Sequence, residues 1–352
     1  MKSINILKEF CNLVGVSGDE VNISRELNKY FKKYNLEVIY DNLGSIFAVK
    51  KCGKLNAQKV MIATNLDEVG FVIKDIDKNG YLKVLELGDI KLERVIGQRV
   101  SIVCSNGKKI LGLLTSNDSK NLSVSKSSEI LVDIGVTNKK EVLELGIAIG
   151  DKLYINGEFE ELSNGNRVMS KAISSRYGCS IIIDILEKIE KEELDFDLYI
   201  GGMVQNKVGF RGSLTSTYLV KPDFAITLEV LEANDIRKQD DTSGVLGDGT
   251  ILCYYDKSIM PNRRVLSKYL ELCEKENIKT QFYYSMASSD AGWIHKMLLG
   301  CPVLKAGIVG RNLNTGNETI DLNDYKSSRD SVIKFIKSLK CEDIEEFKVE
   351  NR

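Results

Sequence analysis

Apolar and polar residues follow two different patterns along the 352-residue chain. Residues 1–69 and 157–352 contain short, almost uninterrupted apolar runs, which are typical of strands buried on both faces. The clearest of these runs are KVMIAT, DLYIGGMV, DFAITLEV and CPVLKAGIV. Segments with helical periodicity separate them, at about 174–191, 263–277 and 324–339. This alternation predicts an α/β domain whose sheet is covered on both faces.

The N-terminal part of the chain also predicts helices. The first covers about residues 4–14, and the second ends near Lys33. Ser17 and Glu20 have the S-x-x-E spacing of a capping box, so we expect them to cap the start of the second helix.

Residues 70–156 have a different texture, with short strands and turn signals. Two hairpin patterns are present, FVIKDI-DKNG-YLKVLEL and RVSIVC-SNG-KKILGLL, and NKKEVLELG is the one predicted helix. The Ser/Lys-rich stretch at 119–129 is predicted to be a loop. We therefore predict a β-rich domain at 70–156, inserted between the two segments of one α/β domain at 1–69 and 157–352.

Composition narrows the classes of partner. The chain has 49 basic and 50 acidic residues without a long run of one sign, so it lacks the charge pattern of a nucleic-acid-binding protein. No window approaches the roughly 20 apolar residues of a membrane span, and the N-terminus lacks the pattern of a signal peptide. The eight cysteines contain no C-x-x-C pair, which favours reduced thiols and a cytoplasmic location. A protein or a small molecule is the expected partner.

Polar residues follow several of the predicted strands. In open α/β sheets, functional groups collect where strands end at their carboxyl edge. These positions carry Asn65 and Asp67, the segment 205–207, Glu229 and the loop that begins at Gly310. A histidine at position 65 would share one face with Asp67, as in a metal site, because strand side chains repeat every second residue. An amide stands there instead.

These segments, in this order, resemble motifs of metallopeptidase family 42, the dinuclear zinc or cobalt aminopeptidases that include the glutamyl, deblocking and tetrahedral enzymes. The similarity runs along nearly the whole chain. GVSGDE resembles GVSG-x-E, ATNLDEVGF resembles AHMDEIGF, SKAISSRYGC resembles S-x-KALDDRAGC, VQNKVGFRG resembles QEEVGLRG, and SSDAG resembles GTDAG. The resemblance implies a zinc-exopeptidase-like three-layer α/β/α domain with an inserted PDZ-like domain, and an oligomer built from dimers.

The chain departs from the family motifs at the chemical positions. The resemblance implies two metal ions held by a His, a bridging Asp, a Glu, an Asp and a final His, with another Glu as general base. The residues at the five ligand positions are Asn65, Ser174, Lys207, Glu229 and Asn314. The base position is Asn206, and Ser175 replaces the second Asp of the family's D-D pair. Asp67 and Glu229 are the positions that stay acidic.

These replacements oppose metal binding on physical grounds. Zinc needs about three or four N, O or S donors, whereas Asn and Ser are weak neutral donors and a charged Lys has no lone pair. An ammonium 4 Å from a unit positive charge is repelled by roughly 4 kcal/mol at an effective dielectric near 20. Asn206 cannot take a proton from a nucleophilic water. We hypothesise that the Lys207 ammonium fills the vacated metal space and pairs with Glu229, Asp67 or both.

We therefore predict a catalytically inactive relative, a pseudoenzyme without a metal cofactor. It would act as a structural or regulatory protein or bind peptides or small molecules, as a homo-oligomer or in a hetero-oligomer with an active paralogue. Residual aminopeptidase activity with an atypical metal site is one alternative. Another is a Ser/Lys hydrolase, with Ser174 or Ser175 as nucleophile and Lys207 as base. The default role of the two serines is to cap a helix.

Two further residues have competing interpretations. The sole histidine, His295, lies in DAGWIHKML and is expected to pack or to cap a helix rather than to bind metal. Arg311 either forms a local salt bridge or binds an anion, and the sequence leaves both roles open.

Overall fold

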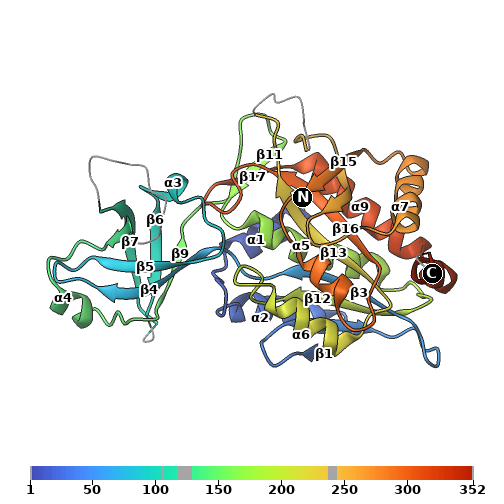
Figure 1. Ribbon diagram of the computed structural model, residues 1–352, viewed down its shortest axis with the longest axis horizontal. Helices are drawn as coiled ribbons and strands as arrows, with labels where there is room; N and C mark the ends of the chain where they lie inside the picture. The colour runs from blue at the N-terminus through green and yellow to red at the C-terminus, as the bar shows by residue number, and fades with distance from the viewer. Residues whose placement is uncertain (1, 105–106, 118–128, 237–243, 351–352) are drawn as a thin grey trace.

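The computed structural model describes residues 2–104, 107–117, 129–236 and 244–350, and Figure 1 shows their arrangement. The helices in these residues are α1 (Lys2–Asn12), α2 (Val21–Lys33), α3 (Leu92–Val95), α4 (Lys139–Glu144), α5 (Ile173–Ile189), α6 (Arg211–Val220), α7 (Arg263–Lys275), α8 (Asp290–Lys296), α9 (Leu322–Ser338) and α10 (Cys341–Val349).

The strands are β1 (Glu37–Tyr40), β2 (Ile46–Lys50), β3 (Lys59–Asn65), β4 (Gly70–Ile76), β5 (Leu82–Leu87), β6 (Arg99–Val103), β7 (Lys109–Ser116), β8 (Ile130–Asp133), β9 (Lys152–Ile155), β10 (Glu160–Glu161), β11 (Arg167–Ser170), β12 (Asp197–Met203), β13 (Phe224–Glu232), β14 (Thr250–Asp256), β15 (Thr280–Ser285), β16 (Val303–Gly310) and β17 (Glu318–Asp321). The predicted loop at 119–129 lies, up to residue 128, outside the described residues.

The largest sheet has the strand order β1-β2-β12-β3-β13-β16. Strands β12, β3, β13 and β16 are parallel, whereas β2 is antiparallel to both of its neighbours. Every residue of β12 and of β16 is buried. The apolar runs therefore predicted the central strands correctly, because a parallel strand covered on both faces has no solvent side on which polar residues could alternate.

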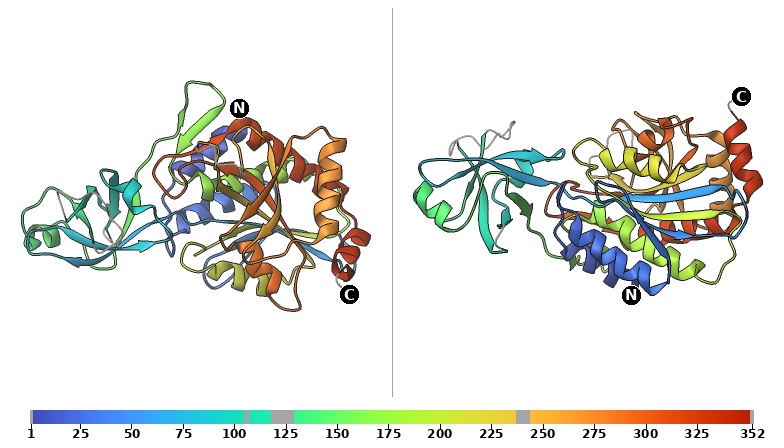
Figure 2. Two further views of the ribbon diagram at one scale, coloured as in Figure 1. Left: turned by 45° about the horizontal axis from the view of Figure 1, so that its top comes forward. Right: turned by 90° about the horizontal axis from the view of Figure 1, so that it is seen from below.

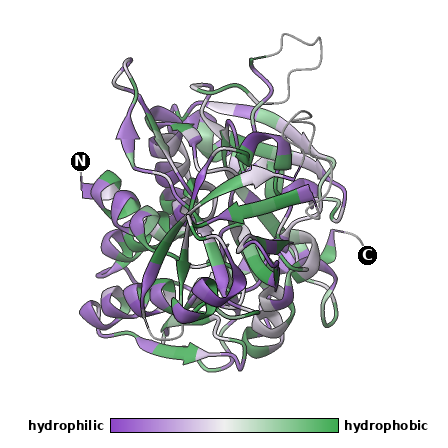
Figure 3. Ribbon diagram, turned by 90° about the vertical axis from the view of Figure 1, so that its left-hand side faces the viewer, coloured by the Kyte–Doolittle hydropathy of each residue, from purple (hydrophilic) through white to green (hydrophobic). Residues whose placement is uncertain are grey.

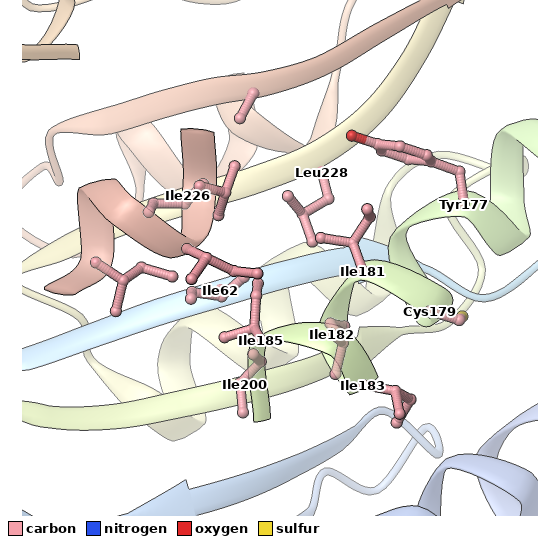
Figure 4. Packing of buried hydrophobic residues seen from close by; sticks show 14 of the residues in the cluster. Ile62, Tyr177, Cys179, Ile181, Ile182, Ile183, Ile185, Ile200, Ile226 and Leu228 are labelled. Carbon is pink, nitrogen blue, oxygen red and sulfur yellow. The ribbon is translucent and has the colours of Figure 1, made fainter. Parts of the chain in front are cut away.

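Helices cover both faces of this sheet (Figure 2). On one face, Ile181, Ile185 and their neighbours on α5 pack against Ile62 of β3 and Ile226 of β13 (Figure 4). The alternate residues of the same strands face α6 and α8 in a second apolar cluster. A Cβ on Gly178 would meet Thr64 Oγ1 at 2.0 Å, so glycine is what allows α5 to approach β3 closely. The predicted three-layer α/β/α arrangement is confirmed.

Residues between Gly70 and Ile155 form a closed barrel with the strand order β4-β5-β8-β7-β6-β9. Both predicted hairpins are present, with Phe71 opposite Glu86 and Ser101 opposite Leu111. The predicted helix is α4, which is capped by the Asn138 side chain. The barrel has its own apolar core, and it faces the viewer in Figure 3. Its likeness to a PDZ domain stays a prediction.

Several features differ from the sequence-based expectations. Strand β14, which pairs in parallel with β15, and the final helix α10 were not predicted. The capping box is wrong, because Glu20 makes no side-chain cap. Ser17 Oγ instead donates to Asp67 Oδ2 at 2.6 Å, and Glu20 Oε1 accepts from Gln205 N at 2.8 Å. Hydrogen bonds to residues that are distant in the sequence therefore replace the local helix cap. None of the helices in the described ranges has the length and apolar character to cross a bilayer.

Candidate functional site

The candidate site lies at the carboxyl edge of the central strands. Asn65 ends β3 opposite Met203 of β12, and the pairing of Thr227 with Ala63 places Glu229 level with Asn65. The side chains of six sequence-predicted positions line one cleft of about 810 Å³. They are Asn65, Ser174, Asn206, Lys207, Glu229 and Asn314. The fold therefore brings together residues that are far apart in the sequence.

The wall of this cleft combines polar and apolar groups. Asp89 and Lys91 reach it from the segment that follows β5, while Phe210 lies at the start of α6 and Tyr283 and Met286 belong to β15 and the loop after it. Glu232 and Leu313 also line the cleft. The contribution of β15 was not predicted, because the motifs give no sign that its loop lies beside the ends of β3 and β13.

Asp67 lies beneath the cleft and is fully buried. Its carboxylate accepts hydrogen bonds from Asn206 N at 2.9 Å, Lys207 N at 2.8 Å and Ser17 Oγ at 2.6 Å. Three donors satisfy most of its capacity as an acceptor. Asp67 thereby fixes the loop after β12, in which Gln205 has a left-handed φ of 54°. Its role in this structure is to position the backbone of that loop.

The hypothesised ion pairs of Lys207 are wrong. Lys207 Nζ is 3.5 Å from Asn314 Oδ1, which is a weak hydrogen bond. Among the described residues, no carboxylate forms a salt bridge with this ammonium. Asp67 binds the Lys207 backbone instead of its side chain. Glu229 is engaged by a different lysine on the neighbouring strand, so neither proposed carboxylate is available to Lys207.

That other lysine is Lys305 on β16, which is only 2% exposed. Its Nζ lies 3.2 Å from Glu229 Oε2 and 2.6 Å from Asp256 Oδ2. Burial opposes its charge, but the attraction of Glu229 and Asp256 outweighs burial and raises the pKa of Lys305. Glu229 Oε1 is buried and has no hydrogen-bond partner within the described ranges. The lysine inside the apolar run VLKAGIV was a signal for this contact, because a buried lysine requires a charged partner.

Glu318 on β17 is a further buried carboxylate near the cleft that was not predicted. It accepts hydrogen bonds from Ser174 N at 2.6 Å, Ser174 Oγ at 3.1 Å and Asn314 N at 2.8 Å. Burial raises the pKa of Glu318, while the Ser174 N–H and the charge of Lys207 partly oppose that increase. Glu318 therefore joins the start of α5 to the loop that carries Asn314.

The predicted capping role of the two serines is wrong. The residue before α5 is Ala172, with a φ of 57°, and it makes no side-chain cap. Ser174 donates to Glu318, while Ser175 Oγ accepts from Asn65 Nδ2 at 3.1 Å. In the described part of the chain, neither serine is hydrogen-bonded to Lys207. The Ser/Lys arrangement therefore lacks the contact that activation of a serine by a lysine requires.

Asn206, at the position of the family's general base, acts as a donor. Its Nδ2 donates to Asp290 Oδ2 at 2.7 Å, and Ser213 Oγ donates to the other oxygen of Asp290. Burial, together with the charges of Glu229 and Asp67, raises the pKa of Asp290 to about 7. The amide at position 206 is thus used to hold a buried carboxyl group in place.

The donor set does not fit a pair of zinc or cobalt ions. Two amides, a hydroxyl, an ammonium and one carboxylate stand at the ligand positions, and that carboxylate already pairs with Lys305. The described residues contain no group of three or more His, Cys, Asp or Glu side chains that could hold a metal. Dinuclear centres of this kind need several imidazoles or carboxylates around each ion.

The remaining two candidates have structural contacts. His295 Nδ1 lies 2.8 Å from the carbonyl oxygen of Cys301, beside a different cleft that residues of α6 and α10 also line. This contact is a hydrogen bond to the backbone, and the expected packing or capping role of His295 stays a prediction. Arg311 pairs with Asp235 through two hydrogen bonds of 2.8 and 2.6 Å, so the local salt bridge is the interpretation that the structure supports.

Comparison with known proteins gives a consistent result. A model of the M42 glutamyl aminopeptidase family matches residues 44–330. Glutamyl aminopeptidase from Lactococcus lactis is 30% identical over 355 residues, which cover 99% of each chain. A TET aminopeptidase from a marine sediment archaeon of the Thaumarchaeota has a TM-score of 0.92 at 29% identity, over 98% of this chain and 99% of that one.

A more distant structure shares the fold. Pyrococcus horikoshii TET1 peptidase, described as assembling into a tetrahedron or a large octahedral shell, has a TM-score of 0.83 at 22% identity and covers 96% of this chain and 100% of its own. The family match and the near full-length relatives agree with the motifs that surround the cleft. This chain belongs to the M42 glutamyl aminopeptidase family.

Proposed function

We propose that this protein is a catalytically inactive member of its family, one that has lost the dinuclear metal site and binds peptides or peptide-like molecules in the cleft. The observation that carries the proposal is the set of side chains at the ligand positions. Lys207 supplies a positive charge where a metal ligand is needed, and Glu229 is already neutralised by Lys305. Asn206 has no basic atom to take a proton from water.

The cleft itself supports a binding function. Its volume of about 810 Å³ falls within the range of roughly 300–1,000 Å³ that small-molecule sites occupy. Glu229 lines the cleft with a side chain that is 14% exposed, which places a carboxylate beside a ligand bound there. Phe210 and Met286 offer apolar contacts on the wall of the same cleft. A peptide has both the donors and the apolar side chains that such a wall accommodates.

The backbone around the cleft supports the same proposal. Four non-glycine residues with left-handed φ angles flank it, namely Ala172, Gln205, Phe210 and Asn314. Residues in sparsely populated backbone regions cost of order 1–3 kcal/mol each and collect at functional sites. Asn tolerates this conformation better than the other three. A cleft without a ligand to bind would gain stability by losing such strain.

We further propose that the chain forms a homo-oligomer, with a hetero-oligomer containing an active paralogue as the second arrangement. The outer face of the barrel exposes Leu85, Leu111 and Leu113, which are apolar side chains that an interface would cover. The name of Pyrococcus horikoshii TET1 describes large assemblies in a protein with this fold. Native mass spectrometry of the pure protein, alone and after co-expression with the active paralogue, distinguishes the two arrangements.

The cytoplasm is the proposed location. All eight cysteines are described, and none forms a disulfide. Free thiols are typical of proteins in a reducing compartment.

The test combines metal analysis, turnover and binding. We expect the pure protein to contain no stoichiometric zinc or cobalt, to leave aminoacyl chromogenic substrates intact, and to bind members of a dipeptide library by calorimetry. Glutamyl aminopeptidase from Lactococcus lactis serves as the positive control for turnover. Hydrolysis that a chelator abolishes would support an atypical metal site instead. Hydrolysis that survives the chelator but is blocked by a serine-directed phosphonate would support the Ser/Lys alternative.

A further inference from the structure

We infer that Lys305 is a tethered counter-cation of the cleft, whose ammonium supplies at Glu229 the positive charge that a metal ion would otherwise provide. The inference rests on the proposed loss of the metal site and goes further, because it names the group that keeps the site folded without metal. Lys207, which the sequence suggested for this role, makes no such contact.

The contacts of Lys305 have the geometry of a charge-balancing group. Its Nζ lies between Glu229 Oε2 at 3.2 Å and Asp256 Oδ2 at 2.6 Å. The pairing of Thr227 with Lys305 across β13 and β16 places Glu229 and Lys305 on the same face of the sheet, since residues two apart share a face. Asp256 approaches from the end of β14. Three strands therefore converge on one ammonium.

Burial makes this ammonium necessary. The side chains of Lys305 and Asp256 are 2% and 0% exposed, and that of Glu229 is 14% exposed. Without Lys305, two carboxylates would share a poorly solvated space and repel each other. Ser258 donates its N–H and Oγ–H to Asp256 Oδ1, so Asp256 has other partners, whereas Lys305 is the one partner of Glu229 in the described chain.

Lys305 also determines how the Glu229 carboxylate is oriented beside the cleft. The ammonium holds Oε2 and leaves Oε1 without a partner within the described ranges. Glu229 lines the cleft with a side chain that is 14% exposed, and the orientation of its carboxylate depends on a lysine that lies behind it. Lys305 acts through Glu229, so it is a positioning residue.

The test uses three variants of the full chain. Lys305→Met removes the ammonium but keeps a long side chain, and Glu229→Gln combined with Lys305→Met also removes the carboxylate charge. Lys171→Met is the matched control, because Lys171 is a buried lysine that pairs with Glu68 away from Glu229. Melting temperatures are measured with and without excess Mg²⁺ or Zn²⁺.

We expect Lys305→Met to lower the melting temperature by about 10 °C and the double variant to recover at least half of that loss. Added divalent cation should raise the melting temperature of Lys305→Met, because a small cation can replace the ammonium between the carboxylates. It should leave the wild-type protein and Lys171→Met unchanged. If Lys305→Met does not fold, folding of the double variant supports the inference, and its failure to fold contradicts it.

Other results would overturn the inference while leaving the proposed function intact. These are a Lys305→Met protein as stable as wild type, a double variant no more stable than Lys305→Met, or a cation response equal to that of Lys171→Met. Stoichiometric zinc or cobalt in the wild-type protein would instead reject the proposed function itself. Elemental analysis of the wild type, made alongside the melting experiments, separates the two failures.

Discussion

The described part of this protein has two buried ion clusters, which differ in whether the central carboxylate has a partner for each of its oxygens. In the first, Glu68 receives Lys171 Nζ at 2.8 Å, Arg176 Nη2 at 3.0 Å and Gly15 N at 2.9 Å. In the second, Lys305 binds Glu229 and Asp256, and Glu229 Oε1 keeps no partner in the described chain. The first cluster is closed by protein donors, whereas the second leaves one buried carboxylate oxygen without a donor, in a residue that lines a cleft.

The difference indicates that the two buried ion clusters have different roles. The Glu68 cluster joins the N-terminal segment, the loop after β3 and α5, so it holds the scaffold together. In the Lys305 cluster, Glu229 lines the cleft, while its Oε1 is buried without a partner in the described chain. A fully satisfied network stabilises one structure, while an unsatisfied buried group needs a further partner such as a water molecule or an ion.

The largest effect is expected when the closed cluster is broken. Glu68→Gln leaves Lys171 and Arg176 buried without their carboxylate, which should cost about 4 kcal/mol of unfolding free energy. Urea unfolding measures the loss. Glu26→Gln is the control, because Glu26 pairs with an exposed Lys29 on the surface and its removal should cost less than about 1 kcal/mol. Equal losses in the two variants would show that the closed cluster is not a stabilising element.

A smaller effect is expected from Asp290, which lies between the cleft and α6. Its pKa is raised to about 7, chiefly by burial and then by Glu229. The folded protein therefore keeps a proton that the unfolded chain releases near its ordinary pKa of 3.8. This contribution to stability is complete below pH about 4 and is lost as the pH rises to about 7, by up to roughly 4 kcal/mol.

Asp290→Asn should remove that dependence. We expect the unfolding free energy of the variant to fall less than that of wild type as the pH rises through this interval. Asp324, whose pKa burial raises to about 6, contributes the same slope to both proteins and cancels in the comparison. Identical pH dependence in the two proteins would contradict a buried, proton-holding Asp290.

The smallest effect on stability is expected from Lys207. Its ammonium has one neutral acceptor at 3.5 Å, in contrast to the two carboxylates that bind Lys305. Lys207→Met should therefore change the unfolding free energy by less than about 1 kcal/mol. The comparison with Lys305→Met by urea unfolding sharpens the contrast between the two lysines. A loss for Lys207→Met as large as that for Lys305→Met would restore Lys207 as the main counter-cation.

The sequence predicted the central strands well and the charge pairing poorly. Runs such as KVMIAT identify β3 because local composition is enough to mark a strand buried on both faces. The six cleft positions followed from motif resemblance, and the fold brings them together. Lys305 neutralises Glu229 because β16 lies beside β13. The end of β14 brings Asp256 to the same ammonium. That strand order is a long-range property with no local signal.

Local rules also failed where tertiary contacts replaced them. Ser17 and Glu20 have the spacing of a capping box, yet their side chains bind Asp67 and Gln205. Ser174 and Ser175 stand in the first turn of α5, yet they bind Glu318 and Asn65. In each case the side chain forms a hydrogen bond with a buried polar group elsewhere in the chain. Leaving that group without a partner would cost more free energy than leaving the helix end uncapped.

The most direct test of the central claim is elemental analysis of the pure wild-type protein, made together with an assay for release of N-terminal residues. The account predicts no stoichiometric zinc or cobalt, even after exposure to either ion and gel filtration, and no release of amino acids. Two tightly held ions in each chain, with cleavage that disappears when a chelator removes them, would contradict it.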